Sequence, residues 1–160
     1  MAIPIRGNTG LGSYFITSAT SQRKLILQSD RMAGLLLDVL FHYRDQNKYL
    51  LHEFVIMPDH FHLLLTPTDT LERSLQLIKG GFSHRARKEL GFAGEIWEKS
   101  FHDRRVRDWE EYSAFRRYIH QNPVKKSLAT SPEEYRYSSA KVGLALDAVP
   151  QRLKPDALTA

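Results

Sequence analysis

The sequence predicts an α+β fold in which an antiparallel sheet carries its helices on one face. Two kinds of pattern predict it: short stretches rich in β-branched and aromatic residues, and longer stretches with an apolar residue at every third or fourth position. They follow one another in the order β-α-β-β-α-β-α. Two β-α-β units joined by a hairpin form the ferredoxin-like βαββαβ arrangement, and the last helix is an addition to it.

The first half of the chain predicts a strand, a helix and a hairpin. Residues 13–19 mix aromatic, β-branched and small side chains without a helical period, as is typical of a strand. Ser29 is a suitable N-cap for a helix of about four turns, because apolar residues recur at helical spacing over positions 32–43. Residues 49–57 and 60–66 favour two further strands, since the Pro-Asp pair between them suits a tight turn.

A second helix is expected to begin after Asp69 or Thr70, either of which can cap it, and to end before Gly91. Its centre contains Gly80 and Gly81, which cost roughly 2 kcal/mol in helix propensity relative to two alanines. A kink in the helix, or a ligand that approaches its backbone closely, would explain why two glycines stand there.

The remaining elements are a fourth strand and a third helix. The strand lies within residues 96–107, which are rich in arginine, and the helix covers residues 109–122 and is expected to stop at Pro123. Residues 141–160 show weak periodicity, so we expect a poorly ordered or peripheral tail. The whole chain of 160 residues has the size of one domain, whose core we place at about residues 12–140.

Composition excludes several classes of function and favours one kind of partner. The chain has no cysteine, so a bound metal would have to use histidine, carboxylate or amide ligands. No apolar run approaches the roughly 18 residues that cross a membrane, and the first ten residues do not resemble a signal peptide, which favours a cytoplasmic protein. Twelve basic and seven acidic residues lie between positions 79 and 126, so this region alone accounts for the net charge of +5. Such a surface favours a polyanionic partner such as nucleic acid.

The clearest candidate for chemistry is the pair His60 and His62. Because side chains alternate along a strand, both imidazoles point to one face, and Phe61 and the following leucines at 63 and 65 point to the other. Two residues at this spacing are about 6.6 Å apart, so both imidazoles can reach one metal ion. Taken alone, such a pair is more often simply two surface histidines on a half-exposed strand.

The third helix carries a second candidate. Tyr118 and Asn122 are four residues apart, hence neighbours on one edge of the apolar stripe formed by Tyr112, Phe115 and Ile119. A tyrosine at the edge of a helix is usually a packing residue, and the polar neighbour strengthens the case for a function only modestly.

Together these segments resemble a known family. His60-Phe61-His62, within MPDHFHLLL, is similar to the histidine-hydrophobic-histidine (HUH) motif of single-strand DNA nucleases and transposases that use a catalytic tyrosine. The segments YIHQNPVK, at positions 118–125, and PEEYRYSSA, at positions 132–140, closely resemble the signature of the REP-associated tyrosine transposases, of the insertion-sequence-200-like (IS200-like) group. The resemblance extends from about residue 12 to residue 140. One departure is Asp59, where an asparagine is usual.

The resemblance implies a site and a reaction. Tyr118 would be the nucleophile, and His60 and His62 would hold Mg²⁺ or Mn²⁺. Asn122 would supply the third ligand; Gln121, which points away around the helix, is the less favoured choice. Attack by Tyr118 on hairpin-forming single-stranded DNA would give a 5′-phosphotyrosine and a free 3′-hydroxyl, from which strands can be rejoined. The expected DNA contacts are Lys79, Arg85, Arg87, Lys88, Arg104, Arg105, Arg107 and Arg117.

Two other functions fit parts of the pattern. A non-catalytic protein that binds single-stranded DNA or RNA could use the same fold, but it would have no need of the tyrosine and the paired histidines. A zinc hydrolase could use the histidines, but the chain lacks an acidic third ligand at His-x-x-x-His spacing. For the transposase we expect a monomer or a homodimer in the cytoplasm, associated with the nucleoid when it is bound to DNA.

Overall fold

A four-stranded antiparallel sheet forms the centre of the protein. The computed structural model describes residues 12–154. Its strands are β1 (Tyr14–Ala19), β2 (Tyr49–Met57), β3 (His60–Pro67) and β4 (His102–Arg105). Their order in the sheet is β2-β3-β1-β4, and each neighbouring pair is antiparallel. This is the strand order of a ferredoxin-like domain, so the fold class predicted from the sequence is confirmed.

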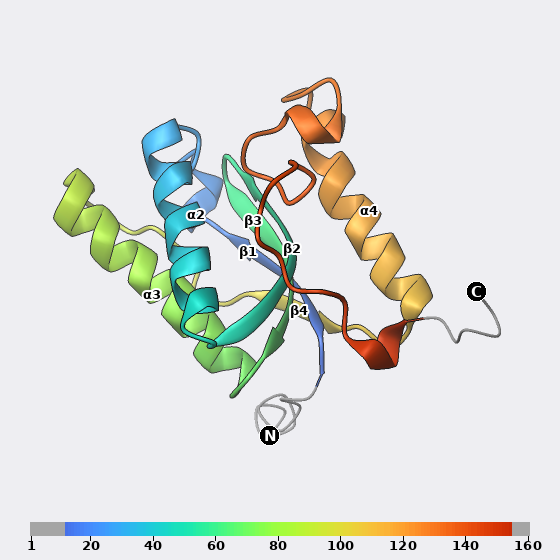
Figure 1. Cartoon of the computed structure of the whole chain (residues 1–160). Coiled ribbons are helices and arrows are strands. Elements are labelled where there is room, and N and C mark those ends of the chain that lie inside the picture. The colour runs from blue at the N-terminus through green and yellow to red at the C-terminus, as the bar shows by residue number, and fades with distance from the viewer. Residues whose placement is uncertain (1–11, 155–160) are drawn as a thin grey trace.

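Helices cover both faces of the sheet (Figure 1). The helices α2 (Asp30–Asp45) and α3 (Leu71–Leu90) pack side by side on one face, while α4 (Trp109–Lys125) crosses the other. The expected caps are present, because the side chains of Ser29 and Thr70 each accept a hydrogen bond from a first-turn N–H group. Gly91 ends α3 in the left-handed conformation, with a φ of 68°. The face that the βαββαβ order leaves open is therefore covered by the helix that carries Tyr118.

The helices differ from expectation in two places. α4 does not stop at Pro123 but continues to Lys125. Proline has no N–H group to donate to the carbonyl four residues earlier in a helix. Only two helical residues follow Pro123, so the lost hydrogen bond falls in the last turn of α4. In α3, which runs unbroken through both glycines, the close approach at Gly81 comes from α2 and not from a ligand. A Cβ atom at Gly81 would lie 2.9 Å from the ring of Tyr43.

Each face of the sheet has its own apolar core. Beneath α2 and α3 the buried side chains include Phe54, Phe61 and Phe82. A smaller cluster lies beneath α4, with Phe15 and Phe115 packed against its edge. Its buried members are Val55, Met57, Leu64, Val106, Tyr112, Ile119 and Leu153. Both α4 and the sheet strands are thus fixed to one another by apolar burial on the side where the candidate site lies.

A β-bulge at His52 changes which side chains of β2 face α4. Leu51 pairs with Leu65 and Glu53 with Leu64, so His52 is the extra residue on this strand. Strict alternation would send Glu53 into the same core as Leu51. With the bulge, His52 and Glu53 both lie on the α4 side instead.

The chain after α4 returns along the outer edge of β2. Tyr137 and Ser139 form backbone hydrogen bonds with this strand. Further along, Asp147 accepts a hydrogen bond from the Leu51 N–H at 2.8 Å and pairs with Arg44 of α2 at 2.9 Å. These contacts cover an edge that would otherwise expose unpaired backbone groups. The weak periodicity of residues 141–160 did not predict the contacts of Asp147.

No helix within residues 12–154 is long and apolar enough to cross a membrane. The segment compared with a signal peptide, at the start of the chain, and residues 155–160 of the tail lie outside the described residues.

Candidate active site

β3 brings His60 and His62 to the face of the sheet beneath α4. Both side chains are buried, and their ring centroids lie 4.8 Å apart with one ring edge-on to the other. The intervening Phe61 points into the core on the opposite face, as the alternation along the strand predicts. The two imidazoles are therefore close enough to act on one ligand.

Each imidazole is held through its Nδ1 atom. His60 Nδ1 lies 2.7 Å from Asp59 Oδ1, and Asp59 also pairs with Arg23 at 3.3 Å. His62 Nδ1 lies 2.8 Å from the Oγ1 atom of Thr17 on β1. Metal-binding histidines usually have such a partner on the nitrogen that does not bind the metal, and the partner orients the ring. This arrangement leaves both Nε2 atoms for a ligand.

Burial favours the neutral form of both histidines. The pKa of His62 is lowered to about 3, chiefly because burial disfavours the charged imidazolium and also because His60 and Arg23 lie near it. Burial likewise lowers the pKa of His60, against the opposing effect of its hydrogen bond to Asp59. Neutral imidazole is the form that coordinates a metal ion.

Tyr118 extends from α4 toward this pair. Its ring centroid lies 5.1 Å from that of His62 and 6.0 Å from that of Phe15, with the rings edge-on in both contacts. Phe15 in turn stacks on Phe115 at 4.4 Å and on His62 at 5.3 Å, so an aromatic cluster joins β1, β3 and α4. Tyr118 is 46% exposed, so a ligand can reach it from solvent.

Asn122 lies one turn beyond Tyr118 and is buried, whereas Gln121 is exposed. The Oδ1 atom of Asn122 and the Nε2 atom of His62 are both buried without a hydrogen-bond partner in the described part of the chain. Buried polar atoms are normally paired, so these two atoms are suitable ligands for a bound ion. No group of three His, Asp or Glu side chains that could hold a metal occurs within residues 12–154, so the third protein ligand here would be an amide. The donors present fit a divalent cation with open positions.

The eight cations expected to bind DNA do not form one surface. Four belong to β4, the residues after it, and α4, and we call them the β4–α4 group: Arg104, Arg105, Arg107 and Arg117. Arg104 lies over the ring of Phe115 at 5.7 Å, so it contacts the aromatic cluster next to Tyr118. The other four are on α3, on the far side of the sheet (Figure 1), and form the α3 group: Lys79, Arg85, Arg87 and Lys88.

Comparison with known proteins places this arrangement in a family. The model of the family described as "Transposase IS200 like" matches residues 10–122, a stretch that contains both histidines, Tyr118 and Asn122. The chain belongs to the IS200-like transposase family. The enzyme class expected from the motifs, a single-tyrosine HUH DNA transposase, is thereby confirmed.

Individual relatives of this transposase agree with the assignment. A Haemophilus influenzae protein named for the REP-associated tyrosine transposases is 26% identical over 147 residues, which cover 80% of this chain and 79% of that protein. A solved structure of a REP-associated tyrosine transposase bound to a REP hairpin shares the fold, with a TM-score of 0.69 at 20% identity over 92% of this chain and 90% of the other. A Deinococcus radiodurans structure described as a transposase has a TM-score of 0.51 at 26% identity, over 73% of this chain and 91% of its own.

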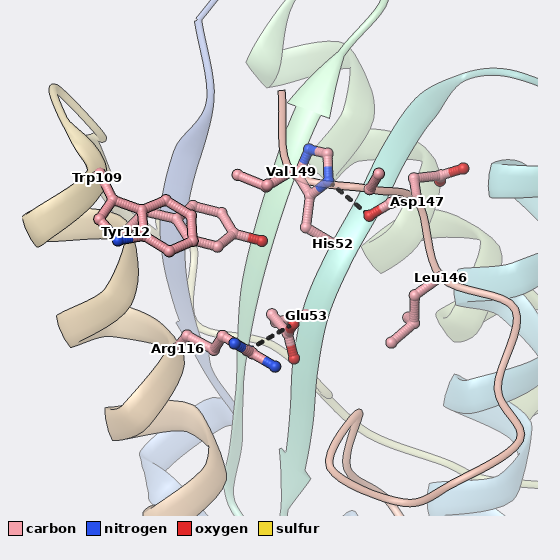
Figure 2. Close-up of a pocket in the computed structure, with 9 residues that line it drawn as sticks. His52, Glu53, Trp109, Tyr112, Arg116, Leu146, Asp147 and Val149 are labelled. Atoms are coloured by element: carbon pink, nitrogen blue, oxygen red, sulfur yellow. Dashed lines mark hydrogen bonds and ion pairs between the residues drawn. The ribbon is translucent and has the colours of Figure 1, made fainter. Parts of the chain in front are cut away.

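Two residues that hold the histidines of this transposase were given no role from the sequence. Asp59 stands directly before the first histidine and was noted only as a departure from the family pattern, whereas Thr17 meets His62 only through strand pairing. A cavity of about 360 Å³ lies between β2, α4 and the tail, with His52 and Glu53 of the bulge in its wall (Figure 2). Tyr118, His60 and His62 do not line this cavity, so it lies beside the candidate active site and not within it.

Proposed function

We propose that this transposase cuts and rejoins hairpin-forming single-stranded DNA, with Tyr118 as the nucleophile and a covalent 5′-phosphotyrosine as the intermediate. The observation that carries the proposal is the contact between the rings of Tyr118 and His62, 5.1 Å apart. It places a phenol beside an imidazole whose buried Nε2 atom has no hydrogen-bond partner among the described residues. One phosphate group can therefore meet both the nucleophile and the proposed metal ligands.

His60, His62 and Asn122 are the proposed ligands of Mg²⁺ or Mn²⁺, through the two Nε2 atoms and the amide oxygen. A bound ion would neutralise charge on the scissile phosphate and make its phosphorus more susceptible to attack. Imidazole ordinarily favours zinc over magnesium, so the choice of ion rests on the family and on the supply of metal in the cell. All three ligands are neutral, so they do not offset the positive charge with which the ion attracts the phosphate.

Tyr118 performs the covalent step. Its hydroxyl oxygen attacks the phosphorus, so the bond between tyrosine oxygen and phosphorus forms while the bond from phosphorus to the 3′-oxygen breaks. The phenolic proton passes to solvent, and the departing 3′-oxygen takes up a proton to become a hydroxyl. The phosphotyrosine keeps the energy of the phosphodiester bond, so attack by a 3′-hydroxyl on it joins a strand without ATP.

Single-stranded DNA beside a hairpin is the proposed substrate. A single strand can bend a phosphate into the site without the cost of unpairing, and its bases can stack on aromatic rings. Arg104 lies over the ring of Phe115 on the side of Tyr118, whereas Arg105 stands opposite Tyr14 and faces the other side of the sheet. Arg104, Arg107 and Arg117 are proposed to contact phosphates. The solved relative bound to a REP hairpin supports the choice of a hairpin. Such a substrate implies a cytoplasmic protein associated with the nucleoid.

A single chain supplies every group in this scheme. α4 packs on β2 and β3 of its own chain, and this packing brings Tyr118 to the histidines. We therefore propose that the monomer is competent for cleavage. The same groups would be present in each subunit of a homodimer.

A strand-labelling experiment tests the proposal. A REP-type hairpin oligonucleotide with a single-stranded flank is labelled at its 3′ end or at its 5′ end and incubated with the protein and Mn²⁺. We expect the 3′-labelled fragment to migrate with the protein on a denaturing gel, and the 5′-labelled fragment to be released with a free 3′-hydroxyl. The alternative function, binding without catalysis, predicts a shifted hairpin on a native gel and no covalent product.

A further inference from the structure

We infer that Glu53 is a positioning residue for Tyr118: its buried carboxylate fixes the rotation of α4 about its axis and thereby the place of the tyrosine over the paired histidines. The inference rests on the proposed role of Tyr118 as the nucleophile. It begins from the bulge in β2, which turns Glu53 toward α4 and leaves it only 8% exposed.

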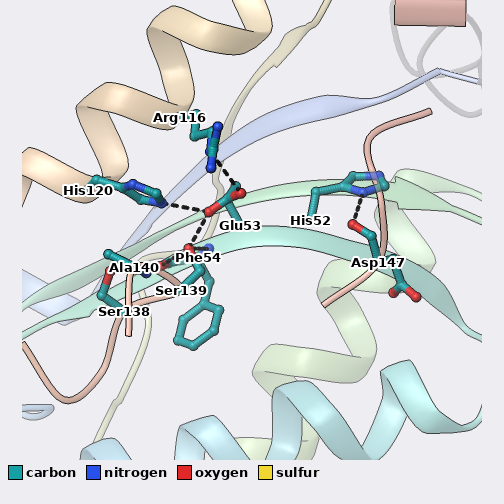
Figure 3. A network of polar contacts seen from close by, with 9 residues as sticks. All are labelled: His52, Glu53, Phe54, Arg116, His120, Ser138, Ser139, Ala140 and Asp147. Atoms are coloured by element: carbon teal, nitrogen blue, oxygen red, sulfur yellow. Dashed lines mark hydrogen bonds and ion pairs between the residues drawn. The ribbon is translucent and has the colours of Figure 1, made fainter. Parts of the chain in front are cut away.

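The carboxylate of Glu53 joins three parts of the chain (Figure 3). Its Oε1 atom accepts hydrogen bonds from His120 Nε2 at 2.7 Å and from Ser139 Oγ at 2.6 Å. Its Oε2 atom pairs with Arg116 Nε at 3.2 Å. A buried carboxylate with this many partners is costly to disturb, because removing it leaves several donors unpaired at once.

Ser139 holds the carboxylate from the side opposite α4. Its hydroxyl oxygen accepts a hydrogen bond from the Phe54 N–H at 2.9 Å while its own hydrogen is donated to Glu53. The carboxylate is therefore fixed to β2 through its own backbone and also through the segment that covers the edge of this strand. Arg116 and His120 of α4 therefore contact a carboxylate whose position is restrained from the opposite side.

The positions of these residues on α4 connect the anchor to the nucleophile. Arg116 and His120 are four residues apart on one flank of the helix, while Tyr118, at about 100° per residue, lies about 160° around from each of them. The buried side chain of Ile119 lies between the two flanks and faces the sheet. A roll of the helix about this line would lengthen the contacts to Glu53 on one flank and displace Tyr118 on the other.

A small roll is enough to matter. A side chain that ends about 6 Å from the helix axis moves by about 1 Å when the helix rolls by about 10°. A displacement of about 1 Å at the reacting atoms can cost about 100-fold in rate. Apolar packing beneath α4 also resists such a roll, and the hydrogen bonds to a fixed carboxylate add a directional restraint on the opposite flank.

The test compares the Glu53→Gln variant with the wild-type protein. A glutamine can accept from one of the two α4 donors, but it presents its amide NH₂ group to the other. We expect the first-order rate of covalent adduct formation at saturating hairpin DNA to fall at least tenfold, while the dissociation constant for the hairpin stays within twofold. A role confined to stability would not separate the rate from the affinity in this way.

Asp147→Asn is the matched control. Asp147 also joins β2 to the returning chain, but its partner is Arg44 of α2 and not a residue of α4. We expect this variant to lower the melting temperature and to leave the adduct rate within twofold of wild type. His120→Ala removes one contact between α4 and Glu53 by changing its more exposed partner. This variant tests the positioning role even if Glu53→Gln does not fold. It should reduce the rate as Glu53→Gln does, and the two losses should not multiply in the double variant.

The outcomes separate this inference from the proposed function. Adduct formation by wild type but not by Tyr118→Phe supports the proposed function alone. The positioning role is overturned if Glu53→Gln or His120→Ala reacts at the wild-type rate, or if Asp147→Asn loses as much rate for a similar loss of melting temperature. If the wild-type protein forms no adduct, the proposed function fails, and the positioning role fails with it.

Discussion

The phenol ring of Tyr118 on α4 lies edge-on to the imidazole ring of His62 on β3, with their centroids 5.1 Å apart. This contact exists because α4 crosses the face of the sheet that α2 and α3 leave open. It brings an exposed tyrosine, the proposed nucleophile, next to a buried nitrogen that has no hydrogen-bond partner within residues 12–154.

Mn²⁺ should stabilise the wild-type protein more than the His62→Gln variant, because the amide oxygen of glutamine is a weaker ligand than imidazole. A ligand that binds only the folded state raises the free energy of unfolding by about 2.7 kcal/mol at 100 times its dissociation constant. The measurement is thermal unfolding across a Mn²⁺ titration, and a chelator should return wild type to a folded, metal-free state. His84→Gln, at an exposed histidine of α3, is the control and should keep the full stabilisation. Equal stabilisation of His62→Gln would place the ion elsewhere.

The salt dependence of hairpin binding should depend on the β4–α4 group more than on the α3 group. Each phosphate contact in a single strand contributes about 0.7 to the slope of log affinity against log salt. Replacing Arg104, Arg107 and Arg117 with alanine should therefore flatten the slope by up to about 2. The triple variant of Arg85, Arg87 and Lys88 has the same change in charge and should flatten it less. A larger effect of the α3 variant would mean that the DNA crosses the other face.

The part of the site that could be predicted depends on local periodicity. Alternation along a strand put His60 and His62 on one face, and helical spacing put Tyr118 and Asn122 on one edge. The preference for Asn122 over Gln121 as the proposed third ligand follows from the same spacing, and the structure buries the first and exposes the second.

The rest could not be predicted because it depends on pairing between distant segments. Strict alternation assigns Glu53 to the face of Leu51, and the bulge that reverses this has no signal in the sequence. Counting charges along the chain showed where the cations are numerous, but it could not show that the sheet separates Arg85 from Arg104. The two glycines of α3 were similarly ambiguous until Tyr43 of α2 was seen to pack against Gly81.

Protonation of His52 should destabilise the protein below neutral pH. Burial lowers the pKa of His52, in spite of the opposing hydrogen bond to the backbone of Asp147. The unfolded chain, with an ordinary pKa near 6.5, therefore binds more protons than the folded chain just below that pH. The contribution is complete above pH 6.5 and is lost as pH falls toward the folded pKa, by at most about 1.4 kcal/mol per unit.

The His52→Asn variant isolates this effect, since its amide can still donate to the Asp147 carbonyl but does not titrate. Chemical denaturation between pH 5 and 7.5 should give a shallower rise of the free energy of unfolding with pH for the variant than for wild type. Parallel curves would show that His52 does not contribute to the pH dependence.

Alanine at the two central glycines of α3 should have different effects. At Gly80 an added Cβ meets nothing within 4 Å, so Gly80→Ala should raise the free energy of unfolding by about 1 kcal/mol through helix propensity. At Gly81 the same gain is opposed by the contact with Tyr43, and forcing a methyl group into a packed interface costs about 1–3 kcal/mol. Urea denaturation of both variants provides the comparison. Equal stabilisation by both would show that the Tyr43 ring moves aside freely.

The most direct test of the central claim is mass spectrometry of the covalent product. Wild-type protein is incubated with the hairpin oligonucleotide and Mn²⁺, digested with a protease and a nuclease, and searched for a peptide that carries a 5′-linked nucleotide. We predict that the modification lies on Tyr118, and that Tyr118→Phe, which keeps the ring packed beside Phe15, binds the hairpin and yields no adduct. An adduct on another residue, or one formed at wild-type yield by Tyr118→Phe, would contradict the assignment of Tyr118 as the nucleophile.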